Sequence, residues 1–126
     1  LGIPGIEHEI SAIYDIAHGA GLAIIFPAWM KYVYKHDVNR FVQFAVRVWD
    51  VEMDFESPER TALEGIKRLE NFFRRIGLPV SFSDADISDE KFHEMASKAT
   101  ANDTSTMGNF VKLNKNDVVN IYKLAK

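Results

Sequence analysis

The stretch SPERTALEGIKRLENFFRRIGLP, residues 57–79, carries strong boundary signals at both ends. Ser57 followed by Pro58 is typical of a helix start, because proline at the first helical position lacks only an N–H that would have no partner there. Gly77 followed by Pro79 is typical of a helix end. Apolar residues recur between them at helical spacing: Ala62, Ile66, Leu69, Phe73 and Ile76. The stretch therefore predicts one long helix with an inward face.

The outer face of this expected helix is charged. Arg60, Glu64 and Arg68 follow one another at four-residue spacing. Such spacing brings opposite charges together on a solvated helix face and adds a few tenths of a kcal/mol per pair. No function follows from this pattern.

Helical periodicity also governs the residues that precede this segment. Residues 7–18 and 21–34 read as two helices, and the second is apolar on nearly all sides. Pro27 is expected to kink or restart that second helix, because it cannot donate a backbone hydrogen bond. A third helix is expected to begin at Asp37 or Asn39 as its cap. The inward face expected for it is Phe41, Ala45, Val48 and Trp49.

Two shorter helices are expected after the long one. Ser88 is the predicted cap of the first and Asn116 the predicted cap of the second. Their inward faces are Phe92, Met95, Ala96 and Ala99, and then Val118, Ile121, Tyr122 and Ala125. Residues 100–114 between them are rich in Asn, Thr and Ser and read as a loop. No segment alternates with a period of two, so residues 1–126 are predicted to form a single all-α, bundle-like domain of about six helices.

Composition narrows the class of protein and its partners. A chain of 126 residues is long enough for one domain with a core. Its 15 basic and 18 acidic residues give a net charge of −3, which argues against nucleic acid and anionic membranes as partners. The absence of cysteine excludes disulfides and thiolate zinc sites and favours the cytoplasm. The apolar run at 21–30 is about half as long as the ~20 residues that span a bilayer.

Two familiar motifs are incomplete. Gly19 and Gly21 do not form the G-x-G-x-x-G turn of dinucleotide-binding proteins, because Ile24 occupies the third position. The run HEIS at His8 matches only half of the H-E-x-x-H zinc motif, because Ala12 stands where the second histidine would be.

Four histidines remain as candidates for chemistry. His8 and His18 stand ten residues apart, which on a straight helix means a rise of about 15 Å and directions about 80° apart. Metal–imidazole bonds are only about 2 Å long, so these two side chains could not share an ion from one unbroken helix. Spacing alone favours two core or helix-end histidines, and His18 before Gly19 fits a helix C-terminus, where a cation is favoured. His36 and His93 read as surface or half-buried residues.

The residue identities in the first segment are more specific evidence than the spacing of its two histidines. HEISAIYDIAHGAGLAIIFPAWMKYV, residues 8–33, closely resembles the region around the metal in iron-dependent (group III) alcohol dehydrogenases, especially their butanol dehydrogenase and aldehyde reductase branch. FVQFAVRVWDV, FFRRIGLPVSFSD and LNKNDVVNIYKLAK follow in the order found in that family's C-terminal helical domain. The resemblance extends over residues 6–126. It implies the C-terminal domain of a dehydroquinate synthase-like fold.

The resemblance assigns roles to two histidines. His18 matches the family histidine that binds the catalytic divalent ion, which is iron or zinc. His8 matches a histidine that lines the active site without binding the metal, so it would act as a catalytic proton relay, a role that suits imidazole. A further ligand histidine of the family falls on Pro4, whose side chain cannot coordinate a metal. Other ligands of the family come from the segment that precedes this one.

The implied activity is hydride transfer between an alcohol or aldehyde and NAD(P). The metal acts there as a Lewis acid on the substrate oxygen. The family holds the nucleotide mainly with an N-terminal α/β domain, so this chain is expected to be a fragment that lacks this domain and is inactive when isolated. Its implied partners are a small alcohol or aldehyde, its own N-terminal domain and a second copy in a homodimer.

An alternative belongs to another class: a non-catalytic helical binding or scaffold module. Surface left without a partner domain would be apolar, and Ile10, Ile13, Phe26 and Trp29 are the candidates for such a patch. Size-exclusion chromatography separates the two hypotheses, since a lone fragment should self-associate and an independent module should not.

Overall fold

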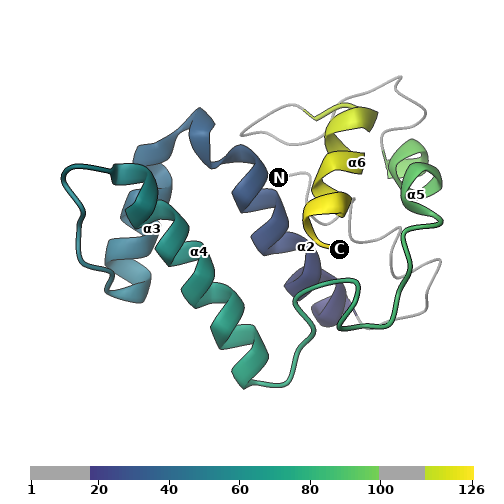
Figure 1. Cartoon of the computed structure of the whole chain (residues 1–126), viewed down its shortest axis with the longest axis horizontal. Helices are drawn as coiled ribbons and strands as arrows, with labels where there is room; N and C mark the ends of the chain where they lie inside the picture. The colour runs from purple at the N-terminus through teal and green to yellow at the C-terminus, as the bar shows by residue number, and fades with distance from the viewer. Residues whose placement is uncertain (1–17, 100–112) are drawn as a thin grey trace.

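The computed structural model describes residues 18–99 and 113–126 (Figure 1). In this part of the chain every element is helical. The elements are α2 (His18–Val33), a 3-10 turn η1 (Tyr34–His36), α3 (Val38–Trp49), α4 (Pro58–Arg75), α5 (Phe92–Ala99) and α6 (Lys115–Leu124). The predicted all-α class is confirmed. The predicted helix at residues 7–17 and the predicted loop at 100–112 lie outside the described residues.

Helix α2 lies in the middle of the molecule, between the pair α3 and α4 on one side and the pair α5 and α6 on the other (Figure 1). It contacts both α4 and α6. Ile24 and Ile25 are fully buried in one core with Ile66 of α4 and Tyr122 of α6. Burial of each such side chain is worth about 1.5–3 kcal/mol relative to exposure. The apolar character of α2 on most sides is therefore a consequence of its central place.

Helix α2 begins three residues before its expected start at residue 21, and Pro27 does not interrupt it. The helix begins at His18, includes Gly19 and Gly21, and continues through Pro27 without a break. Glycine and proline weaken an isolated helix, but most helical stability in a folded protein comes from packing. Because α2 is packed between two neighbours, these residues do not end it.

Helices α3 and α4 run in the same general direction, and residues 50–57 return beside them on the outside (Figure 1). The two helices approach each other closely where Gly65 faces Ala45. Asp37 caps α3 as expected, with its carboxylate accepting a hydrogen bond from the Arg40 N–H at 3.4 Å. At the other end of α3, Arg68 Nη1 donates to the Trp49 carbonyl at 2.7 Å. Arg68 thus also places a positive charge at the negative end of the α3 dipole.

The boundaries of α4 follow the sequence signals. The helix begins with Pro58 after Ser57, although the Ser57 side chain makes no capping hydrogen bond. It ends in a Schellman motif, in which Gly77 N–H donates to the Arg74 carbonyl at 3.0 Å and Leu78 N–H donates to the Phe73 carbonyl at 2.9 Å. Gly77 has a φ of 87°, a conformation that favours glycine.

Two predicted inward residues are in fact exposed. Val48 of α3 is 62% exposed and Ile76 after α4 is 55% exposed. Phe41 and Ala45 are the buried residues of α3, and Val48 lies on its outer side. Ile76 is already the C-cap residue and lies beyond the last turn of α4. Periodicity predicted which side of each helix faces the core. It did not predict where along the helix the neighbouring element stops covering that side.

The caps of the last two helices differ from the prediction. Helix α5 begins at Phe92 instead of following Ser88 directly. Helix α6 is capped by Asn114 instead of Asn116, in a reciprocal capping box with Asp117. That spacing satisfies two otherwise unpaired N–H groups at once, which explains why Asn114 is the cap. The predicted inward faces are confirmed for all described members of both helices.

The residues after α6 fasten the segment that precedes α5. Phe82 N–H donates to the Ala125 carbonyl at 2.7 Å, and Ser83 Oγ donates to the Lys126 carbonyl at 2.6 Å. Lys126 Nζ also contacts Asp89 Oδ2 at 2.8 Å. The segment at 82–89 is therefore held by residues about forty positions further along the chain.

We expect Gly65→Ala to destabilise the protein. A Cβ at Gly65 would lie 2.5 Å from Ala45 Cβ and 2.8 Å from Ala45 Cα, so the backbones of α3 and α4 would have to separate. Overpacking of this kind costs about 1–3 kcal/mol of the free energy of unfolding, which urea denaturation measures. The matched control is Gly19→Ala, which meets no atom within 4 Å and should leave stability unchanged or slightly higher. Equal stability of the two variants would contradict the proposed close approach.

Candidate metal site at the start of helix α2

His18 is the first residue of α2. The expectation that it ends a preceding helix, where a cation would be favoured, is therefore wrong. Neutral imidazole is the form of histidine that binds metal ions. The role of His18 as a ligand stays a prediction.

The far end of α2 is anchored to two neighbouring helices. Tyr32 Oη donates to Asp117 Oδ1 of α6 at 2.6 Å. Lys31 Nζ lies 3.0 Å from Glu70 Oε1 of α4. Between these anchors and His18 the helix rises by about 21 Å and passes through the core. The start of α2 is therefore positioned by contacts made along the whole helix.

The anchor at Tyr32 affects the titration of its hydroxyl. Burial raises the pKa of Tyr32 above its ordinary value of 10.0, and the hydrogen bond to the Asp117 carboxylate raises it further. A hydrogen bond with Asn120 acts in the opposite direction and is the smaller effect. The neutral phenol is therefore the form that the fold stabilises.

The described residues do not form a metal site by themselves. Among residues 18–99 and 113–126, no three His, Asp or Glu side chains lie close enough together to hold an ion. His36 in η1 and His93 in α5 are both exposed, as the sequence indicated. A catalytic zinc site takes about three protein ligands, so a site that includes His18 would need at least two further donors.

The remaining predicted residues fall into two groups. His8, Ile10 and Ile13 lie outside the described residues. Trp29 is only 6% exposed and packs against Phe41 with ring centroids 6.4 Å apart, so it does not belong to an exposed apolar patch. Phe26 is half-buried against the core.

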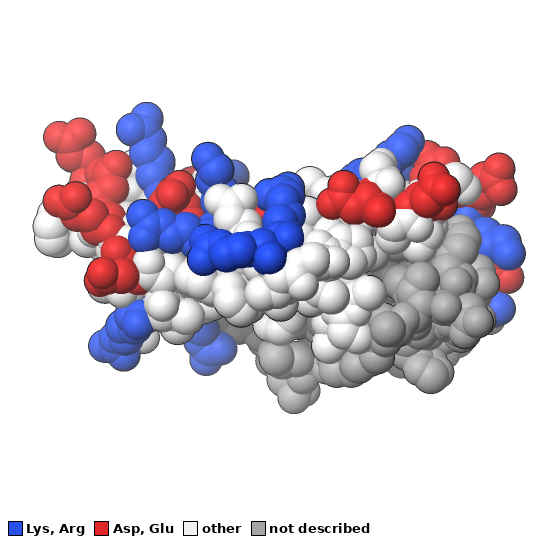
Figure 2. Space-filling view, turned by 90° about the horizontal axis from the view of Figure 1, so that it is seen from below, with Lys and Arg blue, Asp and Glu red and all other residues white. Residues whose placement is uncertain are grey.

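The surface of the described part combines both signs of charge. Figure 2 shows a group of basic side chains near the middle of this face, acidic side chains towards both ends, and further basic ones among them. No helix within residues 18–99 and 113–126 has both the length and the apolar character that crossing a bilayer requires.

The sequence contains a signal for only one part of the anchor between Tyr32 and Asp117. Asn114 and Asp117 stand at capping-box spacing, a local signal that identifies Asp117 as a cap partner. The contact between Tyr32 and Asp117 joins residues 85 positions apart. No local pattern predicts a pair at that separation.

Three comparisons place the chain among known proteins. The family model described as Fe-containing alcohol dehydrogenase family, C-terminal, matches residues 3–126. Probable NADH-dependent butanol dehydrogenase 1 of Bacillus subtilis is 48% identical over 118 residues, which cover 94% of this chain and 30% of that protein. NADH-dependent butanol dehydrogenase A of Clostridium acetobutylicum is 37% identical over 119 residues, with the same coverage. The crystal structure of NADH-dependent butanol dehydrogenase A from Thermotoga maritima has 38% identity and a TM-score of 0.88, and the match covers 98% of this chain and 32% of that one.

The helical architecture and these matches agree on the class, an all-α domain of a larger oxidoreductase fold. The chain belongs to the Fe-containing alcohol dehydrogenase family and corresponds to its C-terminal region. The resemblance read from the sequence is thereby confirmed. The chain spans about 30% of the length of the curated relatives that it matches.

We expect Tyr32→Phe to weaken the anchor of α2 and to change the alkaline stability of the protein. Loss of the hydrogen bond to Asp117 should cost about 1 kcal/mol of the free energy of unfolding at neutral pH. Because the folded pKa of Tyr32 is raised, its contribution is fully present below pH 10.0 and is lost as the pH rises through the folded pKa. Urea denaturation of both proteins from pH 7 to pH 11.5 measures this. Parallel stability curves above pH 10 would contradict the assignment.

Proposed function

We propose that this chain is the metal-site portion of an NAD(P)-linked alcohol dehydrogenase that interconverts small primary alcohols and aldehydes. The observation that carries the proposal is the family match over residues 3–126. The names of the relatives from Bacillus, Clostridium and Thermotoga support butanol and butanal as the size class of the substrate.

His18 has the role of a metal ligand in this proposal. His18 stands at the start of α2, and a neutral imidazole is a common metal ligand. The ion, iron or zinc, supplies a Lewis acid for the substrate oxygen when it is bound. The contribution of the described residues is rigidity, because the packed helix and its anchors at Lys31 and Tyr32 hold the start of α2 in one place. Such positioning matters because a site functions only when its ligands are held in the required geometry.

His8 has the role of a proton relay in this proposal. It stands ten residues before His18, and imidazole can both take up and release a proton near neutral pH. General acid–base catalysis of this kind contributes about 10²–10⁴-fold to a rate. Its support is the resemblance of the HEIS element to the family pattern.

The nucleotide belongs to another part of the enzyme. The glycines of this chain do not make a dinucleotide-binding turn. We assign NAD(P) to an N-terminal α/β domain, which is the partner of this helical domain, and we expect the isolated chain to be inactive. A scaffold role has less support, because Trp29 of the expected docking patch is buried.

The isolated chain should bind neither Fe²⁺ nor Zn²⁺ tightly. The described residues form no ligand cluster, and His18 alone gives a weak site. Isothermal titration calorimetry with each metal under anaerobic conditions measures the affinity. A sub-micromolar dissociation constant that His18→Ala abolishes would show that this chain holds a complete site.

A chimera tests the role of His18 in a complete enzyme. Residues 6–126 of this chain replace the matching segment of the 48% identical Bacillus relative, so that the relative keeps its own residue at the Pro4 position and supplies the nucleotide site. We expect the chimera to retain bound metal and to reduce butanal with NADH. His18→Ala should remove the metal, measured by elemental analysis, and lower kcat/KM by at least about 10³-fold.

His8 is tested in the same chimera. His8→Gln should keep the metal, lower kcat by about 10²-fold and remove a pKa near neutrality from the pH–rate profile. His93→Ala is the control, because His93 is exposed in α5 and should affect neither metal content nor rate.

Full metal content and full activity of the His18→Ala chimera would overturn the proposal.

A further inference from the structure

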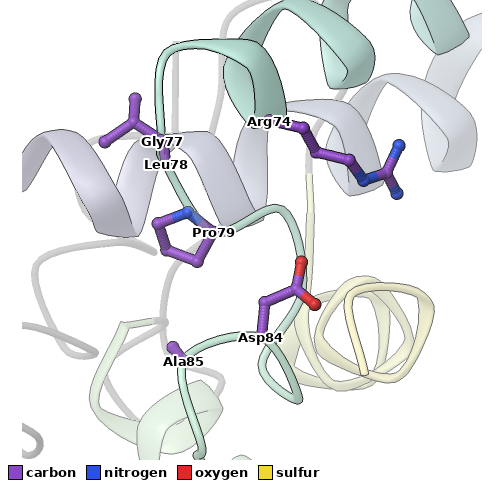
Figure 3. A pocket seen from close by; sticks show the side chains of 6 residues that line it. All are labelled: Arg74, Gly77, Leu78, Pro79, Asp84 and Ala85. Carbon is purple, nitrogen blue, oxygen red and sulfur yellow. The ribbon is translucent and has the colours of Figure 1, made fainter.

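The end of α4 and the loop that follows it form a hollow of about 500 Å³ (Figure 3). Volumes of about 300–1,000 Å³ are typical of pockets that bind small molecules. The hollow is open to solvent, so a ligand can enter it without a change in the fold. We call it the α4-end hollow, and its lining residues are Arg74, Gly77, Leu78, Pro79, Asp84 and Ala85.

Hydrogen bonds hold the wall of the α4-end hollow in one shape. The Gly77 and Leu78 N–H groups donate to carbonyls in the last turn of α4, in the Schellman motif described above. Asp84 N–H donates to Ser81 Oγ at 3.0 Å, and Val80 N–H donates to Asp84 Oδ2 at 3.1 Å. Because the wall is already ordered, little of the binding free energy is lost to its immobilisation.

Two opposite charges face the hollow without pairing with each other. In Figure 3 the Arg74 guanidinium and the Asp84 carboxylate lie on the same side of the Pro79 ring, the first from α4 and the second from the loop. Within residues 18–99 and 113–126, no ion pair joins these two side chains. The hollow therefore presents a cation and an anion at separate positions.

Each charged group is held by a different neighbour and keeps free bonding capacity. Arg74 Nη1 donates to Asn71 Oδ1 at 3.0 Å, which leaves other N–H groups of the guanidinium for a ligand. Asp84 Oδ2 accepts from Val80 N–H, and the second oxygen of the carboxylate can accept from a ligand. A ligand with one negative and one positive group can thus bond to both residues at once.

The remaining wall of the hollow is apolar. Leu78, Pro79 and Ala85 are half-buried, so each exposes part of its side chain to solvent. An apolar group that covers this surface removes it from water, which is favourable. The wall and the two charges together match a small zwitterion with a short apolar side chain.

We propose that the α4-end hollow binds a free α-amino acid with an aliphatic side chain, of the size of leucine. The ligand carboxylate lies against the Arg74 guanidinium, whose N–H groups match two carboxylate oxygens. The ligand ammonium donates to the free oxygen of Asp84, and the aliphatic side chain covers Leu78, Pro79 and Ala85. At neutral pH a free amino acid carries both of these charges. This inference is independent of the proposed catalytic role.

The pair of charges also selects against simpler ligands. A carboxylate without an ammonium group would meet Arg74 but would bring a like charge close to Asp84. An amine without a carboxylate would meet Asp84 but would bring a like charge close to Arg74. Repulsion of this kind is a source of specificity, so a zwitterion is preferred to either single ion.

An NMR titration of the isotope-labelled 126-residue chain tests the site. We expect L-leucine to shift the amide signals of Gly77, Leu78 and Ala85 in a saturable way, with a dissociation constant on the order of 1 mM. N-acetyl-L-leucine lacks the ammonium group and L-leucinamide lacks the carboxylate. Each analogue should bind about tenfold more weakly, because one residue of the pair then has no partner.

Two variants test the charges from the side of the protein. Arg74→Gln and Asp84→Asn should each raise the dissociation constant of L-leucine about tenfold. The asparagine oxygen can still accept from Val80 N–H, so the loop keeps its shape. The matched controls are Arg75→Gln and Asp86→Asn, because these exposed neighbours do not line the hollow and should leave the constant unchanged.

Combining the variants with the analogues assigns each contact. In Asp84→Asn, loss of the ligand ammonium should cost no further affinity, whereas loss of the carboxylate should keep its full cost. In Arg74→Gln, the two losses should have the reverse effects. A titration with L-leucine that does not saturate, analogues that bind as well as L-leucine, or control variants that weaken binding as much as Arg74→Gln would each overturn the proposal.

Discussion

The fold depends on the burial of α2 between two helix pairs. Ile24 and Ile25 reach zero exposure in a core to which α4 contributes Ile66 and α6 contributes Tyr122. This arrangement makes the helix tolerant of Gly19, Gly21 and Pro27, because packing outweighs their low helix propensity. This packing also sets the backbone position of His18, because His18 is the first residue of α2.

Local signals in the sequence predicted much of this architecture. The Ser-Pro start and the Gly-x-Pro end of α4 depend on backbone chemistry that a few neighbouring residues determine. The inward face of α6 followed from periodicity alone. Val48 and Ile76 were misplaced because periodicity gives the direction of a side chain but not the length of the neighbouring helix. The start of α2 was misplaced by three residues, because Gly19 and Gly21 were read as a boundary whereas the packed helix includes both.

The candidate site was predicted in a different way. The spacing of the histidines did not indicate a metal site. The residues at 8–33 indicated one because they resemble the metal region of iron-dependent alcohol dehydrogenases. The family match supports the class, while the described residues offer no cluster of ligands. Ligand geometry is a long-range property that combines segments far apart in a chain, and neither periodicity nor spacing encodes it. The structure describes a packed helix, α2, whose first residue is the predicted ligand His18.

The contact between Tyr32 and Asp117 also bears on how the protein forms during translation. The ribosome produces α2 long before α6, and 85 positions separate the two partners. Until α6 emerges, one apolar side of α2 has no cover, and exposed surface of this kind makes nascent chains prone to aggregate. Contacts of such high sequence separation also slow folding. The apolar surface that α6 covers on α2 therefore lacks this cover until more than eighty further residues have been synthesised.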